Sequence, residues 1–214
     1  MEDSEQMKNI GVRLARPDDA PALLGIYAPY VTGTSVSFEY DAPTEEDFSK
    51  RIATIGSAFP WLVCEADGKA AGYVYASRFA QRAAYRWGAE MSIYLSPDYH
   101  RMGLASALYP CEEALLAAQG YRKLYARITM PNPQSFGLHE HLGFTRTAVY
   151  PNAGYKFGMW RDVSVLEKQI LPLCADPPAP LPITELSPAF ISGEMKKAEE
   201  AIRARNCVFC RSPA

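Results

Sequence analysis

The stretch EMSIYLSPDYHRMGLA, residues 90–105, decides which fold the chain is predicted to adopt. Residues 90–95 are predicted to form a strand, and residues 103–119 have the apolar spacing of a helix. The junction between them is HRMGLA, residues 100–105. Backbone N–H groups and the positive end of a helix dipole meet where such a loop opens a helix. The junction is therefore a candidate anion site, although an ordinary turn into a helix has the same pattern.

A second set of residues follows at fixed spacings after the next predicted strand. Asn132 and Pro133 are typical of a helix start, with Asn132 as the cap and Pro133 in the first helical position. Ser135, His139 and the pair Gly143-Phe144 complete this set. Because both sets occur in order, the interpretation of the junction as a ligand site is favoured over an ordinary turn.

The composition indicates a globular chain. The 214 residues are 48% hydrophobic, which is enough to bury the core of one domain with an appendage. The net charge is −2 without a basic block, which argues against nucleic-acid and membrane-surface partners. No apolar run is long enough for a membrane span, and the polar start MEDSEQMKN is not a signal peptide. Five scattered cysteines favour a reducing, cytoplasmic location over a disulfide-bonded scaffold.

The remaining elements predict an α/β fold, a mixed sheet with helices on its faces. Asp18 is expected to cap a first helix and Thr44 a second, and Gly120 is expected to end the helix at residues 103–119. The apolar face of that helix is predicted to consist of Leu104, Leu108, Cys111, Leu115 and Ala118. The strands are predicted at residues 12–16, 61–66, 70–77, 90–95, 123–128, 144–150 and 163–170, with Asp67-Gly68 as a hairpin turn.

The composition changes at Pro172, where a proline-rich extension over residues 172–214 is predicted to follow a domain at residues 10–171. One short amphipathic helix is expected within it, at residues 194–205, solvated or loosely docked. Truncation after Leu171 is therefore expected to leave activity intact.

The two ends of the chain carry two further expectations. Residues 1–9 are expected to be flexible. Cys207 and Cys210 form a lone pair, and free thiols are favoured over a zinc site because a structural zinc needs four ligands.

The ordered motifs resemble those of the GNAT acetyltransferase superfamily. Its pyrophosphate motif, commonly Arg/Gln-x-x-Gly-x-Gly/Ala, corresponds to His100-x-x-Gly103-x-Ala105. Its second motif, commonly Asn-x-x-Ala-x-x-x-Tyr-x-x-x-Gly-Phe, corresponds to Asn132-x-x-Ser135-x-x-x-His139-x-x-x-Gly143-Phe144. The resemblance implies a GNAT-like fold that binds coenzyme A, with histidine at a position often held by a tyrosine acid.

A closer resemblance, over about residues 10–170, is to the phosphinothricin/methionine sulfone N-acetyltransferase branch. In that branch histidine usually occupies the tyrosine position, which is His139 here. The branch implies acetyl-CoA as donor, a small amino-acid-like acceptor such as phosphinothricin or methionine sulfone/sulfoximine, and a homodimer. The resemblance rests on TSVSFE (34–39), PWLVCEADGKAAGYVYAS (60–77), RAAYRW (82–87), AEMSIYLSPDYHRMGLA (89–105), LHEHLGF (138–144) and YKFGMWRDV (155–163).

The family implies how the donor is bound. Backbone groups at the helix start are expected to bind the pyrophosphate, and the strand before it the pantetheine arm and the thioester carbonyl. Asn132 is expected to bond the pantetheine amide, since capping leaves its NH₂ group free. No metal is expected. The residues predicted for acetyl-CoA are Ile93, Tyr94, Leu95, Arg101, Met102, Gly103, Leu104, Ala105, Ser106, Asn132 and Ser135.

Two residues are predicted to be catalytic. Glu90 is the candidate base for the acceptor amine, directly or through water, and the alternative is a salt bridge with Arg82 or Arg86. His139 is the candidate acid for the leaving thiolate or a contact to coenzyme A, and the alternative is a satisfied histidine packed against Leu142. Direct transfer in a ternary complex is expected, without an acyl-enzyme, because the cysteines at positions 64 and 111 lie on core-facing elements.

The acceptor is expected to be bound by three residues. Arg82 and Tyr85 match the acceptor-binding arginine and tyrosine of the branch, and a guanidinium suits bidentate capture of a carboxylate or phosphinate. Phe38 matches a segment that packs over the acceptor, and the alternative is core packing. Three later residues are expected either at the site or at a dimer contact: Lys156, Phe157 and Trp160.

Two other functions stay open. The first keeps the enzyme class but changes the acceptor to a polyamine, an antibiotic or a protein N-terminus; Arg82 argues against a polycation. The second is an inactive acetyl-CoA-binding sensor, against which Glu90, Asn132 and Gly103 count.

Overall fold

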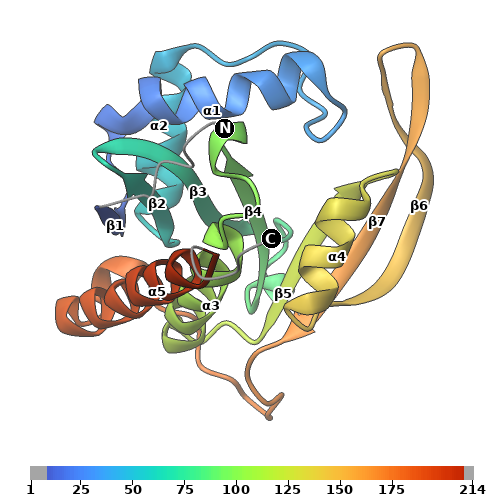
Figure 1. The fold of residues 1–214 in the computed structure, drawn as a ribbon. Coiled ribbons are helices and arrows are strands. Elements are labelled where there is room, and N and C mark those ends of the chain that lie inside the picture. Colours follow the sequence, from blue (N-terminus) through green and yellow to red (C-terminus); the bar gives the residue numbers. More distant parts are fainter. Residues whose placement is uncertain (1–8, 210–214) are drawn as a thin grey trace.

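The computed structural model describes residues 9–209, with side chains described as far as Arg205. A seven-stranded mixed sheet has the order β1-β2-β3-β4-β5-β7-β6, with β4 and β5 parallel and the other neighbours antiparallel. Figure 1 shows α1 and α2 on one side of the sheet and α3 and α5 on the other, which confirms the predicted α/β fold. The strands are β1 Ile10–Leu14, β2 Trp61–Ala66, β3 Lys69–Arg78, β4 Gly88–Leu95, β5 Lys123–Thr129, β6 Thr145–Lys156 and β7 Met159–Gln169. The helices are α1 Ala20–Gly33, α2 Glu45–Gly56, α3 Leu104–Gln119, α4 Pro133–His141 and α5 Pro188–Phe209.

Alternating side chains of the central strands build a hydrophobic core on each face of the sheet. Along β2, Trp61 and Val63 pack with Phe48 of α2 in one cluster. Leu62 and Cys64 belong to the other cluster, together with buried residues of α3. This period of two follows from strand geometry. A central strand therefore presents one set of side chains to each helix layer.

Strands β4 and β5 separate after a short parallel contact. They pair at Gly88 with Lys123, at Ala89 with Leu124 and at Glu90 with Tyr125, and at no later position in the described chain. Strand β4 nevertheless continues to Leu95, paired with β3 on its other side. Beyond Glu90, the edge of β4 that faces β5 thus lacks strand partners. This opening positions the candidate site.

The described part of the extension is docked on the domain. Helix α5 begins earlier than expected, at Pro188, and has 22 residues. It packs on α3 and β1, and Ile191, Ala198 and Ile202 are buried in the core on that face. These residues recur on one helical face. The expectation of a solvated or loosely docked helix is therefore wrong.

Polar side chains of α5 also bind the free edge of β1. The Val12 N–H donates to Oε1 of Glu199 (2.9 Å), and Arg203 donates to the Ile10 carbonyl (2.5 Å). A sheet edge left unpaired is prone to association with other chains, and α5 covers this one. Truncation after Leu171 was expected to leave activity intact because the extension was predicted to pack only loosely on the domain. The structure contradicts that reason, since the extension contributes buried apolar groups and hydrogen bonds to the β1 edge.

The first helix begins later than predicted. A short 3₁₀ turn occupies Pro17–Asp19, and α1 starts at Ala20. Asp18 does not cap it. Asp19 instead accepts from the Arg16 N–H (2.7 Å) and pairs with Arg13, so its carboxylate closes the turn before α1.

The predicted helix ends at Thr44 and Gly120 are confirmed, whereas the apolar face of α3 needs correction. Thr44 Oγ1 accepts a backbone N–H of α2, and Gly120 has the left-handed φ of 99° that a C-cap requires. Ala118 is exposed. Glu112 and Gln119 are buried in its place. The face of α3 is broader than predicted because α5 covers a second side of it.

The last two strands form a longer hairpin than predicted. Strand β6 runs Thr145–Lys156 and β7 Met159–Gln169, joined by a turn at Phe157 and Gly158, both with positive φ. Figure 1 shows this hairpin extending away from the body of the molecule. The sequence pattern missed the extension because most of its residues are exposed on both faces.

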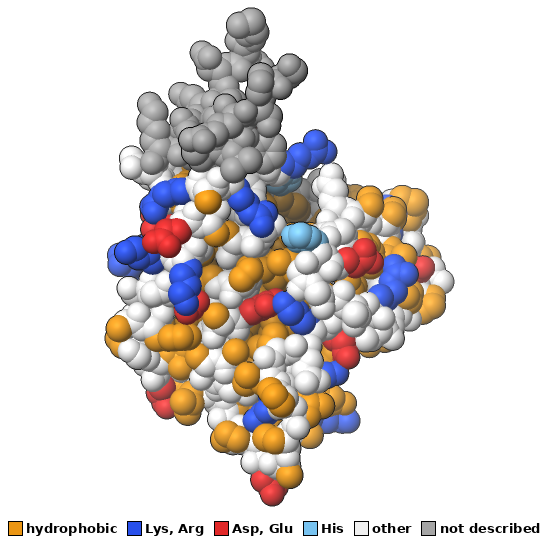
Figure 2. Space-filling model, turned by 60° about the horizontal axis from the view of Figure 1, so that its bottom comes forward, with side chains coloured by type: hydrophobic (Ala, Val, Ile, Leu, Met, Phe, Trp, Pro, Cys, Tyr) orange, Lys and Arg blue, Asp and Glu red, His pale blue; other side chains and the backbone are white. Residues whose placement is uncertain are grey.

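The surface carries charges of both signs. On the face shown in Figure 2, Lys and Arg side chains lie among Asp and Glu side chains, with hydrophobic groups between them. This mixture agrees with the net charge of −2. Within residues 9–209, no helix is both long and apolar enough to cross a membrane. The expectations for residues 1–8 and for Cys210 lie outside the described residues, as does the Cys207 side chain.

Candidate active site

The HRMGLA junction has the backbone shape of an anion site. Arg101 and Gly103 have positive φ values of 63° and 80°, which turn the chain sharply into α3. Gly103 is the N-cap and makes no side-chain cap bond, so the first N–H groups of α3 lack a side-chain partner. Leu104 is buried, so its contribution to a ligand is limited to the backbone. The predicted residues Met102, Ala105 and Ser106 lie in the same turn.

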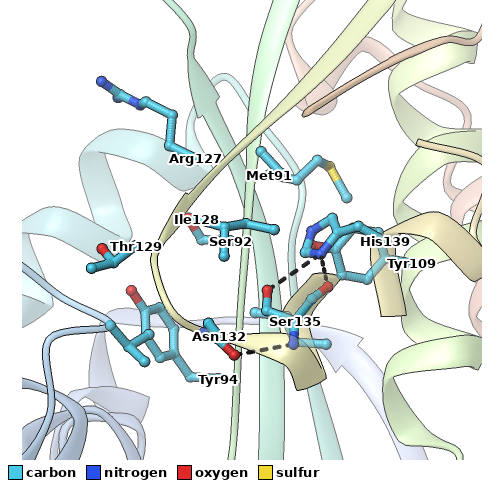
Figure 3. Close-up of a pocket in the computed structure, with 13 residues that line it drawn as sticks. Met91, Ser92, Tyr94, Tyr109, Arg127, Ile128, Thr129, Asn132, Ser135 and His139 are labelled. Atoms are coloured by element: carbon cyan, nitrogen blue, oxygen red, sulfur yellow. Dashed lines mark hydrogen bonds between the residues drawn. The ribbon is translucent and has the colours of Figure 1, made fainter. Parts of the chain in front are cut away.

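A cavity occupies the opening between β4 and β5. Figure 3 shows side chains of β4, β5, α3 and α4 around it. Ile93 and Tyr94 line it, and the Leu95 carbonyl accepts from the Tyr30 hydroxyl (2.7 Å). The lining comprises Val36, Met91, Ser92, Ile93, Tyr94, Tyr109, Ala126, Arg127, Ile128, Thr129, Asn132, Ser135 and His139.

The start of α4 forms one wall of this cavity. The Asn132 side chain accepts the Ser135 N–H (3.1 Å), which confirms the predicted cap. Both residues line the cavity. The amide nitrogen of Asn132 has no partner among the described residues, as expected for a group that is to bond a ligand carbonyl.

His139 is buried, and both ring nitrogens have partners. Nδ1 lies 2.7 Å from the Ser135 carbonyl, which only accepts, so Nδ1 carries the hydrogen. Burial lowers the pKa of His139, so the ring is neutral and Nε2 accepts. The Tyr109 hydroxyl, 2.8 Å away, therefore donates to Nε2. The imidazole therefore has no free N–H for a thiolate and is a satisfied, buried histidine.

Tyr109 is a site residue that sequence reasoning missed. It is fully buried, it lines the cavity and it is the polar partner of His139. Burial raises its pKa, so the hydroxyl keeps its proton at neutral pH. Tyr109 directly follows Leu108 and lies outside the predicted apolar stripe of α3, so the helical spacing gave no signal for it.

Glu90 is ion-paired, but not with the expected partner. Arg127 Nε donates to Glu90 Oε1 (2.6 Å), and a second guanidinium nitrogen contacts Oε2. The alternatives Arg82 and Arg86 make no such contact. The parallel register pairs Glu90 with Tyr125, which puts the side chain two residues later on the same face of the sheet. Glu90 itself lines none of the three described cavities. Its partner Arg127 lines two of them.

A second cavity, of about 280 Å³, adjoins the first and contains Phe38. A Cβ at Gly154 would lie only 2.2 Å from the Phe38 ring, so glycine is required there for this packing. Arg127 and Thr129 line both cavities. The second cavity is lined by Val36, Phe38, Arg127, Thr129, Tyr150, Ala153 and Val163.

Lys156 holds the loop that carries Phe38. Its side chain is 2% exposed, and Nζ donates to the carbonyls of Val31 and Ser37 (2.6 Å each). Lys156 is thus a structural anchor, whereas Phe157 and Trp160 are exposed on the hairpin. Its ammonium thus connects the end of α1, the loop that carries Phe38 and β6.

The other two predicted acceptor residues lie elsewhere. Arg82 is exposed and lines none of the three described cavities. Tyr85 is 49% exposed and lines a third cavity with Phe79, Trp87 and Tyr125. This cavity shares no lining residue with the two at Arg127, so the structure does not bring Arg82 and Tyr85 together with Phe38.

A family comparison agrees with this geometry. The acetyltransferase (GNAT) domain family matches residues 12–165. The chain belongs to this family. The acetyltransferase is 34% identical to phosphinothricin N-acetyltransferase of Streptomyces viridochromogenes over 185 residues, 86% of this chain and 100% of that protein. It is 29% identical to an L-methionine sulfoximine/L-methionine sulfone acetyltransferase of Pseudomonas paraeruginosa over 171 residues, 78% and 98% of the two chains.

A solved structure is similar in fold and contains the donor. The phosphinothricin acetyltransferase of Sinorhizobium meliloti, crystallised with AcCoA, is 33% identical with a TM-score of 0.72, covering 75% of this chain and 88% of that one. The present chain is therefore an acetyl-CoA-dependent N-acetyltransferase. Its unpaired β4 edge suits an extended amide-containing arm, and the N-terminus of α3, where Gly103 lies against the Arg205 side chain, suits a pyrophosphate. Among residues 9–209, no group of three or more His, Cys, Asp or Glu is arranged to hold a metal.

Proposed function

We propose that the acetyltransferase acetylates the amino group of a small amino-acid analogue, of the phosphinothricin or methionine sulfone/sulfoximine type. The supporting observation is the separation of β4 and β5 at Glu90, because the donor-side and acceptor-side cavities meet there. The named relatives include phosphinothricin and methionine sulfone acetyltransferases, which favours the same acceptor class. Transfer is direct, with donor and acceptor bound together.

The acceptor cavity favours a small anionic molecule. Its lining is mostly apolar, with two hydroxyl side chains and one charged side chain, Arg127, among the described residues. Phe38 packs over the acceptor. A polyamine would bring positive charge against this guanidinium. Arg82 and Tyr85, which the family resemblance assigned to the acceptor, lie outside the two cavities at Arg127, so the proposal gives them no acceptor contact.

In the proposed mechanism each residue holds or moves one proton. Glu90 accepts a proton from the acceptor ammonium, a contribution of about 10²–10⁴-fold for a general base. Acetyl-CoA supplies an activated acetyl thioester, and the unpaired groups of the β4 edge near Ile93 and Tyr94 polarise its carbonyl. Tyr109 turns its hydroxyl proton from His139 to the leaving thiolate, and water returns a proton to the phenolate. His139 positions the hydroxyl between turnovers.

No cysteine is proposed as a nucleophile. Burial raises the pKa of Cys64 and of Cys111 to about 12, so both stay protonated thiols at neutral pH. A thiol in that state attacks a thioester poorly. This supports direct transfer, and free thiols agree with the proposed cytoplasmic location.

A homodimer is part of the proposal. The β6–β7 hairpin exposes Tyr155, Phe157, Met159 and Trp160, with exposed fractions of 48–62%. Such a cluster is typical of a protein contact. Light scattering should give twice the chain mass, and Trp160→Lys should shift the protein toward the monomer; an unshifted dimer would place the contact elsewhere.

Free-thiol release from acetyl-CoA tests the acceptor class. The panel is phosphinothricin, methionine sulfone, free amino acids and spermidine. Turnover confined to amino-acid analogues supports the proposal, and turnover of spermidine alone overturns it. Tight acetyl-CoA binding without turnover across the panel would favour the sensor alternative.

Glu90→Gln and Tyr109→Phe test the two proton roles. Each should lower kcat by at least about 100-fold and leave acetyl-CoA affinity within about threefold. A pH–rate profile of Glu90→Gln that matches wild type would remove Glu90 as the base.

A further inference from the structure

The Glu90–Arg127 ion pair lies between the two cavities, with its cation accessible. Both side chains project from the same face of the sheet, and two guanidinium nitrogens contact the two carboxylate oxygens. The Arg127 side chain is 52% exposed, whereas that of Glu90 is 13% exposed. A ligand that enters the site therefore meets the guanidinium first.

Arg127 faces the acceptor side. Figure 3 shows its side chain extending away from Asn132, Ser135 and His139, the groups on the donor side. It lines the cavity that contains Phe38, and it is the one charged residue of that described lining. Thr129 and Tyr150 line the same cavity and carry hydroxyl groups. One bidentate cation, hydroxyl groups and apolar walls make a site for a carboxylate attached to a short side chain.

The two charges of the pair also match the two charges of an α-amino acid. A carboxylate is the natural partner of a guanidinium, and an ammonium is the natural partner of Glu90. Ammonium and carboxylate are bonded to one carbon of such a molecule. An acceptor of this class can thus replace one ion pair by two, without leaving either protein charge alone.

We propose that Arg127 binds the α-carboxylate of the acceptor, exchanging its bond to Glu90 for that carboxylate and freeing Glu90 for the ammonium. This inference rests on the proposed function and names the group that selects its substrates. It assigns to Arg127 the anchor role expected of Arg82. Acceptors whose carboxylate is blocked as an amide lose this contact and are poor substrates.

The test compares methionine sulfone with its carboxamide, which differ at the group that Arg127 is to bind. Arg127→Gln should lower kcat/KM for the acid by about 10–100-fold, as expected for a lost charge-assisted hydrogen bond. For the carboxamide the change should stay within about threefold, since it has no carboxylate to lose. The loss of Arg127 also releases Glu90, but this effect changes kcat/KM for both acceptors alike. It therefore cancels in the acid-to-amide ratio of kcat/KM. The KM for acetyl-CoA should not change.

Two further variants sharpen the test. Arg127→Lys keeps the charge without the planar fork and should recover part of the preference for the acid. Arg82→Gln is the matched control, an exposed arginine outside the cavities, and should leave the acid-to-amide ratio unchanged. If Arg82→Gln collapses the ratio and Arg127→Gln does not, the anchor is Arg82 and the inference is wrong.

The outcomes separate this inference from the function on which it rests. Wild-type enzyme that acetylates methionine sulfone, with a ratio unaffected by Arg127→Gln, overturns the inference alone. Wild-type enzyme that acetylates no amino-acid analogue overturns both. If Arg127→Gln fails to fold, Arg127→Lys still decides, because an unchanged ratio in that variant excludes bidentate binding.

Discussion

Docking of α5 predicts a definite loss of stability for Ile202→Ala. Ile202 is 0% exposed and belongs to the core cluster on the α3 face. Shortening a fully buried isoleucine to alanine removes its transfer free energy and leaves a cavity, at a total of about 2–5 kcal/mol. We expect about 3 kcal/mol, because α5 is a surface helix that can move toward α3 and reduce the cavity. For a domain of this size, that lowers Tm by about 6–12 °C.

Urea unfolding and calorimetry measure this loss. Phe190→Ala is the matched control on the same helix, since Phe190 is 39% exposed and its removal should change stability by about 0.5 kcal/mol or less. The chain truncated after Leu171 should be less stable than Ile202→Ala. If Ile202→Ala costs no more than Phe190→Ala, then α5 does not dock in solution and the assignment of the extension to the core is refuted.

Three further outcomes are expected. The stability of Glu112→Gln relative to wild type should increase with pH. Burial raises the pKa of Glu112, so the wild-type protein loses stability as the pH rises from the ordinary carboxyl pKa through the raised one. Unfolding at about pH 5 and about pH 8 checks the sign, and a pH-independent difference would mean that Glu112 is already ionised in the folded protein. Gly103→Asp should bind acetyl-CoA at least about tenfold more weakly than Gly103→Asn, because the two variants share a shape and differ in charge at the proposed phosphate loop; equal affinities by calorimetry would exclude that loop. Lys156→Met should cost about 1–3 kcal/mol and raise the acceptor KM, since the Val31 and Ser37 carbonyls lose their donor; a wild-type KM would show that this anchor does not order the acceptor loop.

Much of the donor side could be predicted because it depends on local sequence. Gly103 and Gly120 mark the ends of α3 through their left-handed φ values, and Asn132 caps α4 through a bond to a nearby N–H. The Asp67-Gly68 turn between two apolar runs indicated the β2–β3 hairpin. Interactions between residues a few positions apart leave a pattern in the sequence.

The candidate acid and the acceptor anchor could not be predicted in the same way. The state of His139 depends on Tyr109, which lies on another helix, and the partner of Glu90 depends on the parallel register that brings Arg127 alongside it. Lys156 resembles an ordinary strand lysine until β6 is placed against the end of α1. Each of these contacts joins residues whose separation along the chain carries no periodic signal.

The sequence by itself determined the α/β fold, the acetyltransferase family and the place of the proposed phosphate-binding junction, because apolar runs, turn residues, helix caps and left-handed glycines are local. Only the tertiary structure decided that β4 and β5 separate at Glu90, that Arg127 pairs with Glu90 and that α5 completes the core. The physical reason is that strand register and helix docking are set by packing over the whole chain, which brings together charges and apolar faces from distant segments.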